Sequence, residues 1–132
     1  MAQMSVRQQH EWKAATTWGI AQAQKKPWLT ENFDEELLVL FAETVGVYGL
    51  SVVEDNPDGF FQHAAEYDHA STTISYVPDW DTNSASWETV LHELAHAVQF
   101  NADPNTPVED CHGADFISIF AYVIAEAEKE IA

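Results

Sequence analysis

Residues 88–100 read ETVLHELAHAVQF and contain the pattern His-Glu-x-x-His, formed by His92, Glu93 and His96. On an α-helix each residue turns by about 100°, so the two histidines lie about 40° apart, one turn from each other. Two imidazoles at this spacing can bind one metal ion, and a carboxylate beside the first can reach a water on that metal. The spacing therefore predicts a zinc site in which Glu93 is the general base and proton shuttle.

The alternative is an ordinary amphipathic helix whose two histidines share a surface face by chance. The flanking sequence favours the zinc site, because no proline interrupts residues 89–100 and because Asn83 or Ser84 can cap the helix. The apolar side chains cluster on another side of this helix: Trp87, Leu91, Leu94 and Val98. We therefore expect the two histidines to point away from the core, where a metal ion can reach them.

A catalytic zinc site has three protein ligands and keeps a fourth position for water, so one more ligand must come from elsewhere. His112 is the best candidate, because it follows the loop after the motif helix and precedes Gly113 at the start of the last helix. A neutral imidazole suits zinc. The sequence leaves three other ligands open: Asp115, Cys111 and Glu126.

The length of the chain and its cysteine content narrow the class of protein. A chain of 132 residues is most simply one domain, and its one cysteine cannot form an internal disulfide. The N-terminal part lacks the pattern of a secretory signal, and no run of roughly 18 apolar residues is present. We therefore expect a reducing, cytoplasmic location and no membrane span.

The charge is large and unevenly distributed. The formal net charge is -17; residues 1–26 have four basic residues against Glu11, a net +3, which leaves -20 for residues 27–132. Such an acidic body repels phosphate groups, so direct nucleic-acid binding is not expected.

The periodicity and the turn residues predict the elements. They are a helix at 5–26, a helix that begins with a capping box of Asn32 and Glu35, strands at 50–53, 60–67 and 71–77, the motif helix, a loop at 101–107 and a helix at 114–130. The predicted fold is α+β: a basic helical segment at 1–26 and a domain at 27–132. In that domain a small three-stranded sheet, antiparallel because its links are short, or mixed, packs on the motif helix and the C-terminal helix.

The motif and the segment after it resemble a known family. HELAH on a helix, followed by HGADF at the start of another, resembles the SprT-like zinc metallopeptidases and related small phage and bacterial proteins, over about residues 60–125. The resemblance implies a minimal zincin-like fold in which His92, His96 and His112 bind Zn²⁺ and Glu93 is the catalytic acid/base. The HGADF segment has Ala and Asp where the family often has Pro and Glu, which keeps Asp115 open as a ligand.

The resemblance also implies where a peptide substrate would bind. An edge strand before the active helix would receive it in extended form; here that strand would be 72–77, with Ile74, Ser75 and Tyr76 as the substrate-binding residues. Tyr76 could also stabilise an oxyanion, although cross-strand packing is an alternative role for its ring. Family members that act on proteins crosslinked to DNA carry basic parts, which this acidic body lacks, so we expect that substrate not to apply.

Three functions are compatible with these residues. The first is a zinc metallopeptidase acting on a peptide or protein, the second is a non-catalytic, zinc-stabilised acidic module that binds a basic protein, and the third is a zinc amidase acting on a non-protein amide. Glu93 favours an enzyme, because a structural zinc site does not need a carboxylate beside the first histidine and usually fills its fourth position with Cys or His. Substrate preference and oligomeric state are left open.

Overall fold

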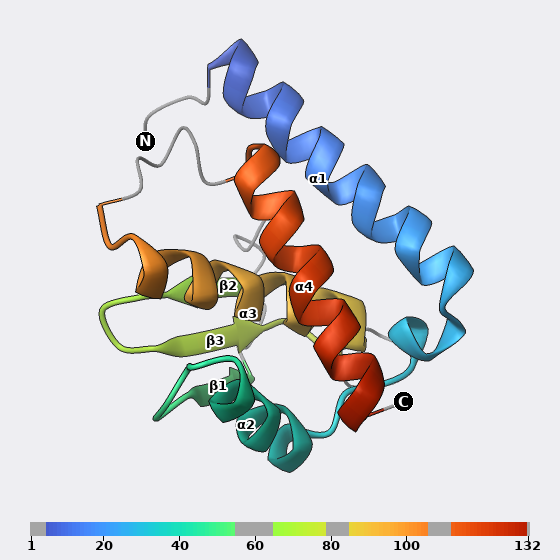
Figure 1. Ribbon diagram of the computed structural model, residues 1–132, viewed down its shortest axis with the longest axis vertical. Coiled ribbons are helices and arrows are strands. Elements are labelled where there is room, and N and C mark those ends of the chain that lie inside the picture. Colours follow the sequence, from blue (N-terminus) through green and yellow to red (C-terminus); the bar gives the residue numbers. More distant parts are fainter. Residues whose placement is uncertain (1–4, 55–64, 79–84, 106–111, 132) are drawn as a thin grey trace.

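The computed structural model describes residues 5–54, 65–78, 85–105 and 112–131. The elements are α1 (Val6–Lys25), the 3₁₀ helix η1 (Pro27–Thr30), α2 (Glu35–Thr44), β1 (Ser51–Glu54), β2 (Ala65–Asp68), β3 (Thr73–Tyr76), α3 (Trp87–Ala102) and α4 (Ala114–Glu130). Figure 1 shows that α3 lies between the small sheet and α4, and that α1 runs alongside α4. The α+β class expected from the sequence is confirmed.

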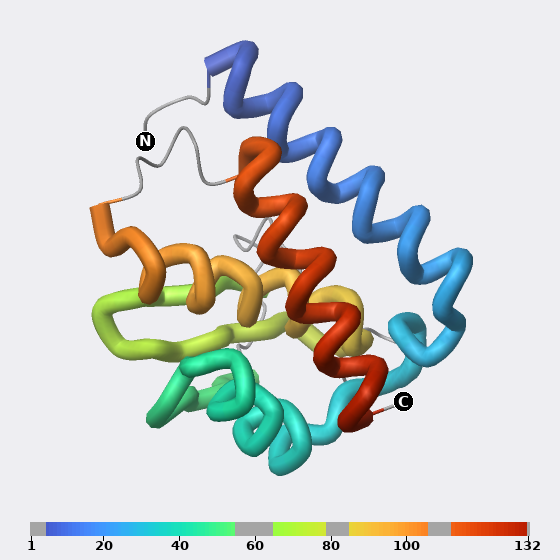
Figure 2. Tube along the Cα trace, viewed as in Figure 1, coloured from blue at the N-terminus to red at the C-terminus, as the bar shows by residue number. Residues whose placement is uncertain are grey.

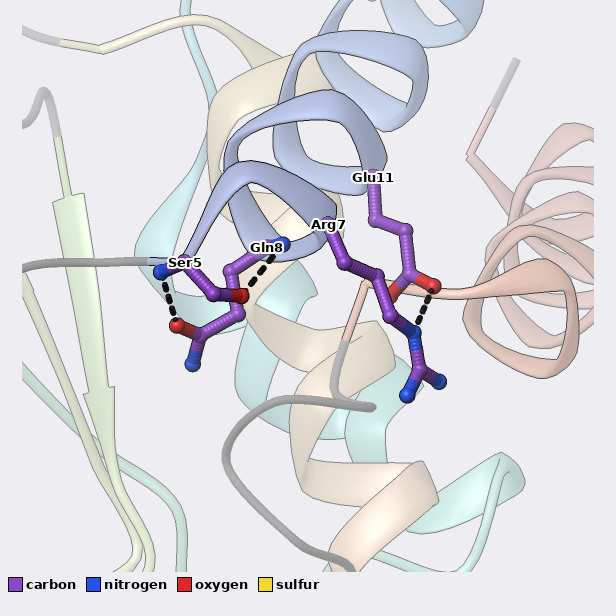
Figure 3. Close-up of polar contacts among 4 residues, drawn as sticks. All are labelled: Ser5, Arg7, Gln8 and Glu11. Atoms are coloured by element: carbon purple, nitrogen blue, oxygen red, sulfur yellow. Dashed lines mark hydrogen bonds and ion pairs between the residues drawn. The ribbon is translucent and has the colours of Figure 1, made fainter.

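The basic N-terminal segment forms α1, which begins with a capping box. The side chain of Ser5 accepts a hydrogen bond from the N–H of Gln8 at 3.1 Å, and Gln8 Oε1 accepts one from the N–H of Ser5 at 2.6 Å (Figure 3). Arg7 Nε donates to Glu11 Oε1 at 2.9 Å on the exposed side of the first turns. Because Ala15 is fully buried and the helix contacts α3 and α4, α1 packs into the same core as the motif helix.

The start of α2 differs from the prediction. Asn32 is paired with Ser86 in an isolated antiparallel bridge, so its backbone is held extended two residues before the cap. The side chain of Asp34 caps the helix instead, accepting from the N–H of Leu37 at 3.0 Å. The predicted capping box of Asn32 and Glu35 is therefore wrong.

The same bridge sets the start of α3. Residues 85 and 86 stay extended against residues 32 and 33, so the helix begins only at Trp87. The side chain of Ser86 is the cap, accepting from the N–H of Thr89 at 3.3 Å. The expected cap at Asn83 or Ser84 is wrong, and those two residues lie outside the described ranges.

The three strands form a mixed sheet in the order β1-β3-β2. β2 pairs with β3 antiparallel, with Tyr67 opposite Ile74, whereas β1 pairs with β3 in parallel, with Ser51 opposite Thr73. The antiparallel expectation is wrong for β1 and β3, because β2, which follows β1 in the chain, lies on the other side of β3 and runs antiparallel to it, so that β3 has the direction of β1. The described strands cover 51–54, 65–68 and 73–76; residues 60–64 of the second predicted strand lie outside the described ranges.

The position of β3 corrects a functional expectation. Residues 73–76 pair with β1 on one side and with β2 on the other, so β3 is the central strand. Its backbone groups are used within the sheet, and the side chain of Ile74 is fully buried. The expectation that 72–77 is an edge strand, at which Ile74, Ser75 and Tyr76 pair with a substrate, is therefore wrong. Among the described strands, the edges are β1 and β2.

The core lies on both sides of α3. Its largest fully buried side chains are Phe41, Phe116, Phe120, Leu29, Leu38, Ile74, Leu91 and Leu94. Figure 2 shows α4 crossing the side of α3 that faces away from the sheet. The expectation that the histidines point away from the core is wrong, because α4 covers their side of the helix. No helix in the described ranges combines the length and the apolar character that crossing a bilayer requires.

Candidate metal centre

Two histidines of α3 face α4. His92 and His96 lie one turn apart, and their ring centroids are 5.1 Å apart. His96 is 7% exposed, and the side chain of His92 is 14% exposed. Both rings therefore belong to the seam between the two helices.

The third histidine comes from the start of α4. Gly113 is the N-cap of α4, which places His112 directly before the helix and beside α3. His112 Nε2 lies 3.1 Å from His96 Nε2, and the possible ligand atoms of His92, His96 and His112 all lie within 4.8 Å of one another. The three histidines singled out by the sequence are thus close enough to hold one metal ion.

Two phenylalanines of α4 fix the imidazole rings. Phe116 stacks on His96, with ring centroids 4.3 Å apart and planes at 21°, and lies 4.9 Å from His92. Phe120 lies 5.4 Å from His92 and 5.3 Å from Trp18 of α1. Phe116 and Phe120 therefore line the histidine cluster and limit the orientations that the imidazole rings can adopt.

The donor set fits a small divalent metal ion. In a tetrahedral zinc site with Zn–N bonds of about 2.0–2.1 Å, neighbouring nitrogens lie about 3.3–3.4 Å apart. The 3.1 Å between the Nε2 atoms of His96 and His112 is close to that spacing. Burial lowers the pKa of His96 to about 4, helped by His112 and opposed by the hydrogen bond to Gln99. His96 is therefore neutral near pH 7, the form that binds metals.

Gln99 is a residue of this site that the sequence analysis missed. It is 5% exposed, and its Oε1 lies 3.1 Å from Nδ1 of His96. The spacing of three residues on one helix places the two side chains next to each other. This spacing from the second histidine was the signal in the sequence that could have identified it.

Glu93 lies beside the histidine cluster on the side of β2. Its Oε2 is 4.0 Å from Nε2 of His92, and its side chain is 12% exposed. Burial, and then the charges of Glu66 and Glu88, raise the pKa of Glu93 to about 8, while a hydrogen bond from the backbone N–H of Tyr67 lowers it. A carboxyl group with a pKa near neutrality can both accept and donate a proton at physiological pH.

Two of the three rival ligands, Asp115 and Glu126, are not part of the histidine cluster. Asp115 is exposed and is not among the three clustered residues. Glu126 accepts from Lys129 at 3.2 Å, on the side chain's own helix. Cys111 lies outside the described ranges.

Tyr76 and His69 make contacts elsewhere. The ring of Tyr76 packs edge-on against Phe33 at 5.1 Å, a residue between η1 and α2 rather than on a neighbouring strand. His69 follows β2, and its Nδ1 lies 3.1 Å from the hydroxyl of Tyr67.

Comparisons with protein families, with curated proteins and with solved structures give no match for this chain.

Proposed function

We propose that this protein is a zinc-dependent metallopeptidase that hydrolyses peptide bonds with Glu93 as general base. The observation that carries the proposal is the convergence of His92 and His96 of α3 with His112, which precedes α4, next to the carboxyl group of Glu93. The same residues carry the resemblance of HELAH and HGADF to the SprT-like metallopeptidases. Burying polar side chains such as His96 and Glu93 costs free energy, and titratable groups in such surroundings cluster where a protein does chemistry.

The three histidines would hold the metal. A zinc ion bound there would lower the pKa of a coordinated water towards 7 and would polarise a carbonyl group under attack. Phe116 and Phe120 keep the imidazole rings in place and exclude water from the side of the site formed by α4. Because imidazoles bind a metal in their neutral form, the positive charge of the site would come from the ion.

Glu93 moves the proton. Its carboxylate can accept a proton from the attacking water and deliver it to the nitrogen of the leaving amine. The hydrogen bond from the N–H of Tyr67 orients the carboxylate towards β2, and the 4.0 Å to His92 keeps it next to the donor set without making it a ligand.

The substrate would bind along β2 rather than β3. β2 is an edge strand among the described strands, and it contacts α3. In an antiparallel pair, alternate residues direct both backbone groups away from the partner strand. Because the N–H of Tyr67 bonds Glu93, Tyr67 and Ala65 are the residues that face away from β3. An extended peptide paired with Ala65 and with the C=O of Tyr67, whose N–H is occupied by Glu93, would pass beside that carboxyl group.

The burial of the centre favours one other function. A metal ion held between α3 and α4 would also join the two helices, and the acidic body could then bind a basic protein without catalysis. This non-catalytic module predicts a metal-dependent rise in stability with no turnover, whereas the peptidase predicts both.

Substitution of Glu93 tests the enzyme. Zinc-replete protein should contain about one zinc per chain, in the parent and in Glu93→Gln, and His96→Ala should contain almost none. A peptide library rich in Lys and Arg, chosen to suit the charge of -17, is incubated with each variant and its cleavage is followed by mass spectrometry. Glu93→Gln should slow cleavage by about 10²–10⁴-fold because the proton acceptor is lost.

Glu126→Gln, the same change at a glutamate paired with Lys129, is the matched control and should cleave like the parent. Cleavage by Glu93→Gln at the parent rate would refute the role of Glu93. Zinc binding by the parent without cleavage of any peptide would favour the non-catalytic module.

A further inference from the structure

Two polar side chains stand out in the interior. Among the described residues, His96 and Gln99 are the polar side chains that are almost entirely buried, with 7% and 5% exposure. They are bonded to each other, with 3.1 Å between His96 Nδ1 and Gln99 Oε1. Since an amide oxygen only accepts hydrogen bonds, Nδ1 carries the hydrogen and donates it to Gln99.

The other nitrogen of the same ring faces the candidate metal centre. His96 Nε2 lies 3.1 Å from His112 Nε2. A neutral imidazole carries one hydrogen, so a hydrogen on Nδ1 leaves the lone pair of Nε2 free for a metal. Without a partner at Nδ1 the hydrogen could move to Nε2 and block this ligand, and the ring would lose a contact that sets its orientation.

We propose that Gln99 is the positioning residue of the metal centre, which holds His96 in the tautomer and orientation that present Nε2 to the ion. This inference rests on the proposed metal site. Partners of this kind commonly include carboxylates, which also raise the basicity of the ligand. The side chain of Gln99 is a neutral amide. It therefore orients the ring of His96 without adding negative charge to a site that already contains Glu93.

The test compares variants that keep or remove the acceptor. Gln99→Leu removes it, Gln99→Asn shortens its reach, and Gln99→Glu keeps an oxygen at the same distance along the side chain. Gln22→Leu, on α1, is the matched control for the loss of a glutamine amide. Zinc affinity is measured by competition with a chromophoric chelator, and the tautomer of His96 by long-range ¹H–¹⁵N NMR of the metal-free chain.

We expect Gln99→Leu and Gln99→Asn to bind zinc about 10–100-fold more weakly, with the hydrogen of His96 no longer held on Nδ1. Gln99→Glu should bind zinc within a few-fold of the parent, and Gln22→Leu should match it. Unchanged zinc affinity in a folded Gln99→Leu chain would overturn the proposal. If that variant does not fold, unchanged affinity in Gln99→Asn, or a loss in Gln99→Glu equal to that in Gln99→Asn, would do so.

The two proposals fail differently. If the parent binds no zinc, the proposed metal site is wrong, and the NMR experiment still tests Gln99. Parent protein with the hydrogen on Nδ1, lost in Gln99→Asn, would support the orienting role, and the same tautomer in both chains would refute it.

Discussion

The two ends of α4 are held in different ways. At its N-terminal end, Phe116 and Phe120 are fully buried and pack on His92 and His96. At its C-terminal end Ile124 and Ala127 are also buried, but the polar groups there are exposed: Lys26 Nζ donates to Glu128 Oε2 at 2.6 Å, and Thr44 Oγ1 donates to Glu130 at 3.2 Å.

The difference shows where polar residues are costly. The exposed pairs at the C-terminal end gain little and cost little, because water solvates them in either state. The imidazoles at the N-terminal end lose their hydration. A hydrogen bond or a metal ion must offset the free energy that this loss costs. Leucines would fill that space at lower cost, so the buried polar side chains at this end are the ones on which the proposed metal centre rests.

The largest effect is expected at the buried end. Phe120→Ala should lower the free energy of unfolding by about 3–5 kcal/mol, because it leaves a cavity among His92, Phe116 and Trp18. Urea unfolding of zinc-free protein measures this loss. Tyr122→Ala, on the same helix but 48% exposed, should change it by less than about 0.5 kcal/mol. Equal losses in the two variants would show that the burial of Phe120 does not stabilise this end of α4.

A further carboxyl group largely removed from water, that of Glu88 on α3, makes the cost of burying a polar group measurable as a pH dependence of stability. It lies on the first turn of α3, and its carboxyl group packs so close to Gly19 of α1 that a Cβ there would overlap it. Burial raises the pKa of Glu88 above its ordinary 4.5. The folded chain therefore retains a proton that the unfolded chain has released, and this group's contribution to stability falls as the pH rises above about 4.5.

Replacement of Glu88 tests whether its contribution to stability falls as the pH rises. Glu88→Gln should raise the free energy of unfolding near neutral pH and should lose this advantage as the pH approaches 4.5, as measured by urea unfolding across that range. Glu36→Gln, at an exposed position of α2, is the control and should leave the pH profile unchanged. A parent advantage over Glu88→Gln that grows with pH would refute this account of the carboxyl group.

The smallest effect is expected at the exposed end. Lys26→Ala breaks the pair with Glu128, whose side chains are 29% and 44% exposed, and should cost about 1 kcal/mol or less at low salt. Lys25→Ala removes the same charge one residue earlier and isolates the effect of the pair. The difference between the two variants should shrink in high salt. A salt-independent loss of several kcal/mol would show that this end is as tightly coupled as the other.

Local patterns in the sequence predicted the long helices well. The expected helices at 5–26 and 114–130 correspond to α1 (Val6–Lys25) and α4 (Ala114–Glu130), because helix periodicity and end residues act over a few residues. The predicted helix caps failed where distant residues intervene: the pairing of Asn32 with Ser86 moved the first helical residue of both α2 and α3. The sheet order failed for the same reason, since strand pairing depends on how the chain returns to the sheet.

The features of the candidate site also fall into two groups, those set by local sequence and those set by tertiary packing. The sequence by itself determined that His92, Glu93 and His96 lie on one helix with the spacing of a metal site, because helix geometry fixes neighbours three and four residues apart. Only the tertiary structure decided that His112 joins them, that α4 covers their side of α3, that Gln99 bonds one of the rings and that the edge strand beside Glu93 is β2. These features depend on packing between segments far apart in the chain, which no local pattern of residues specifies.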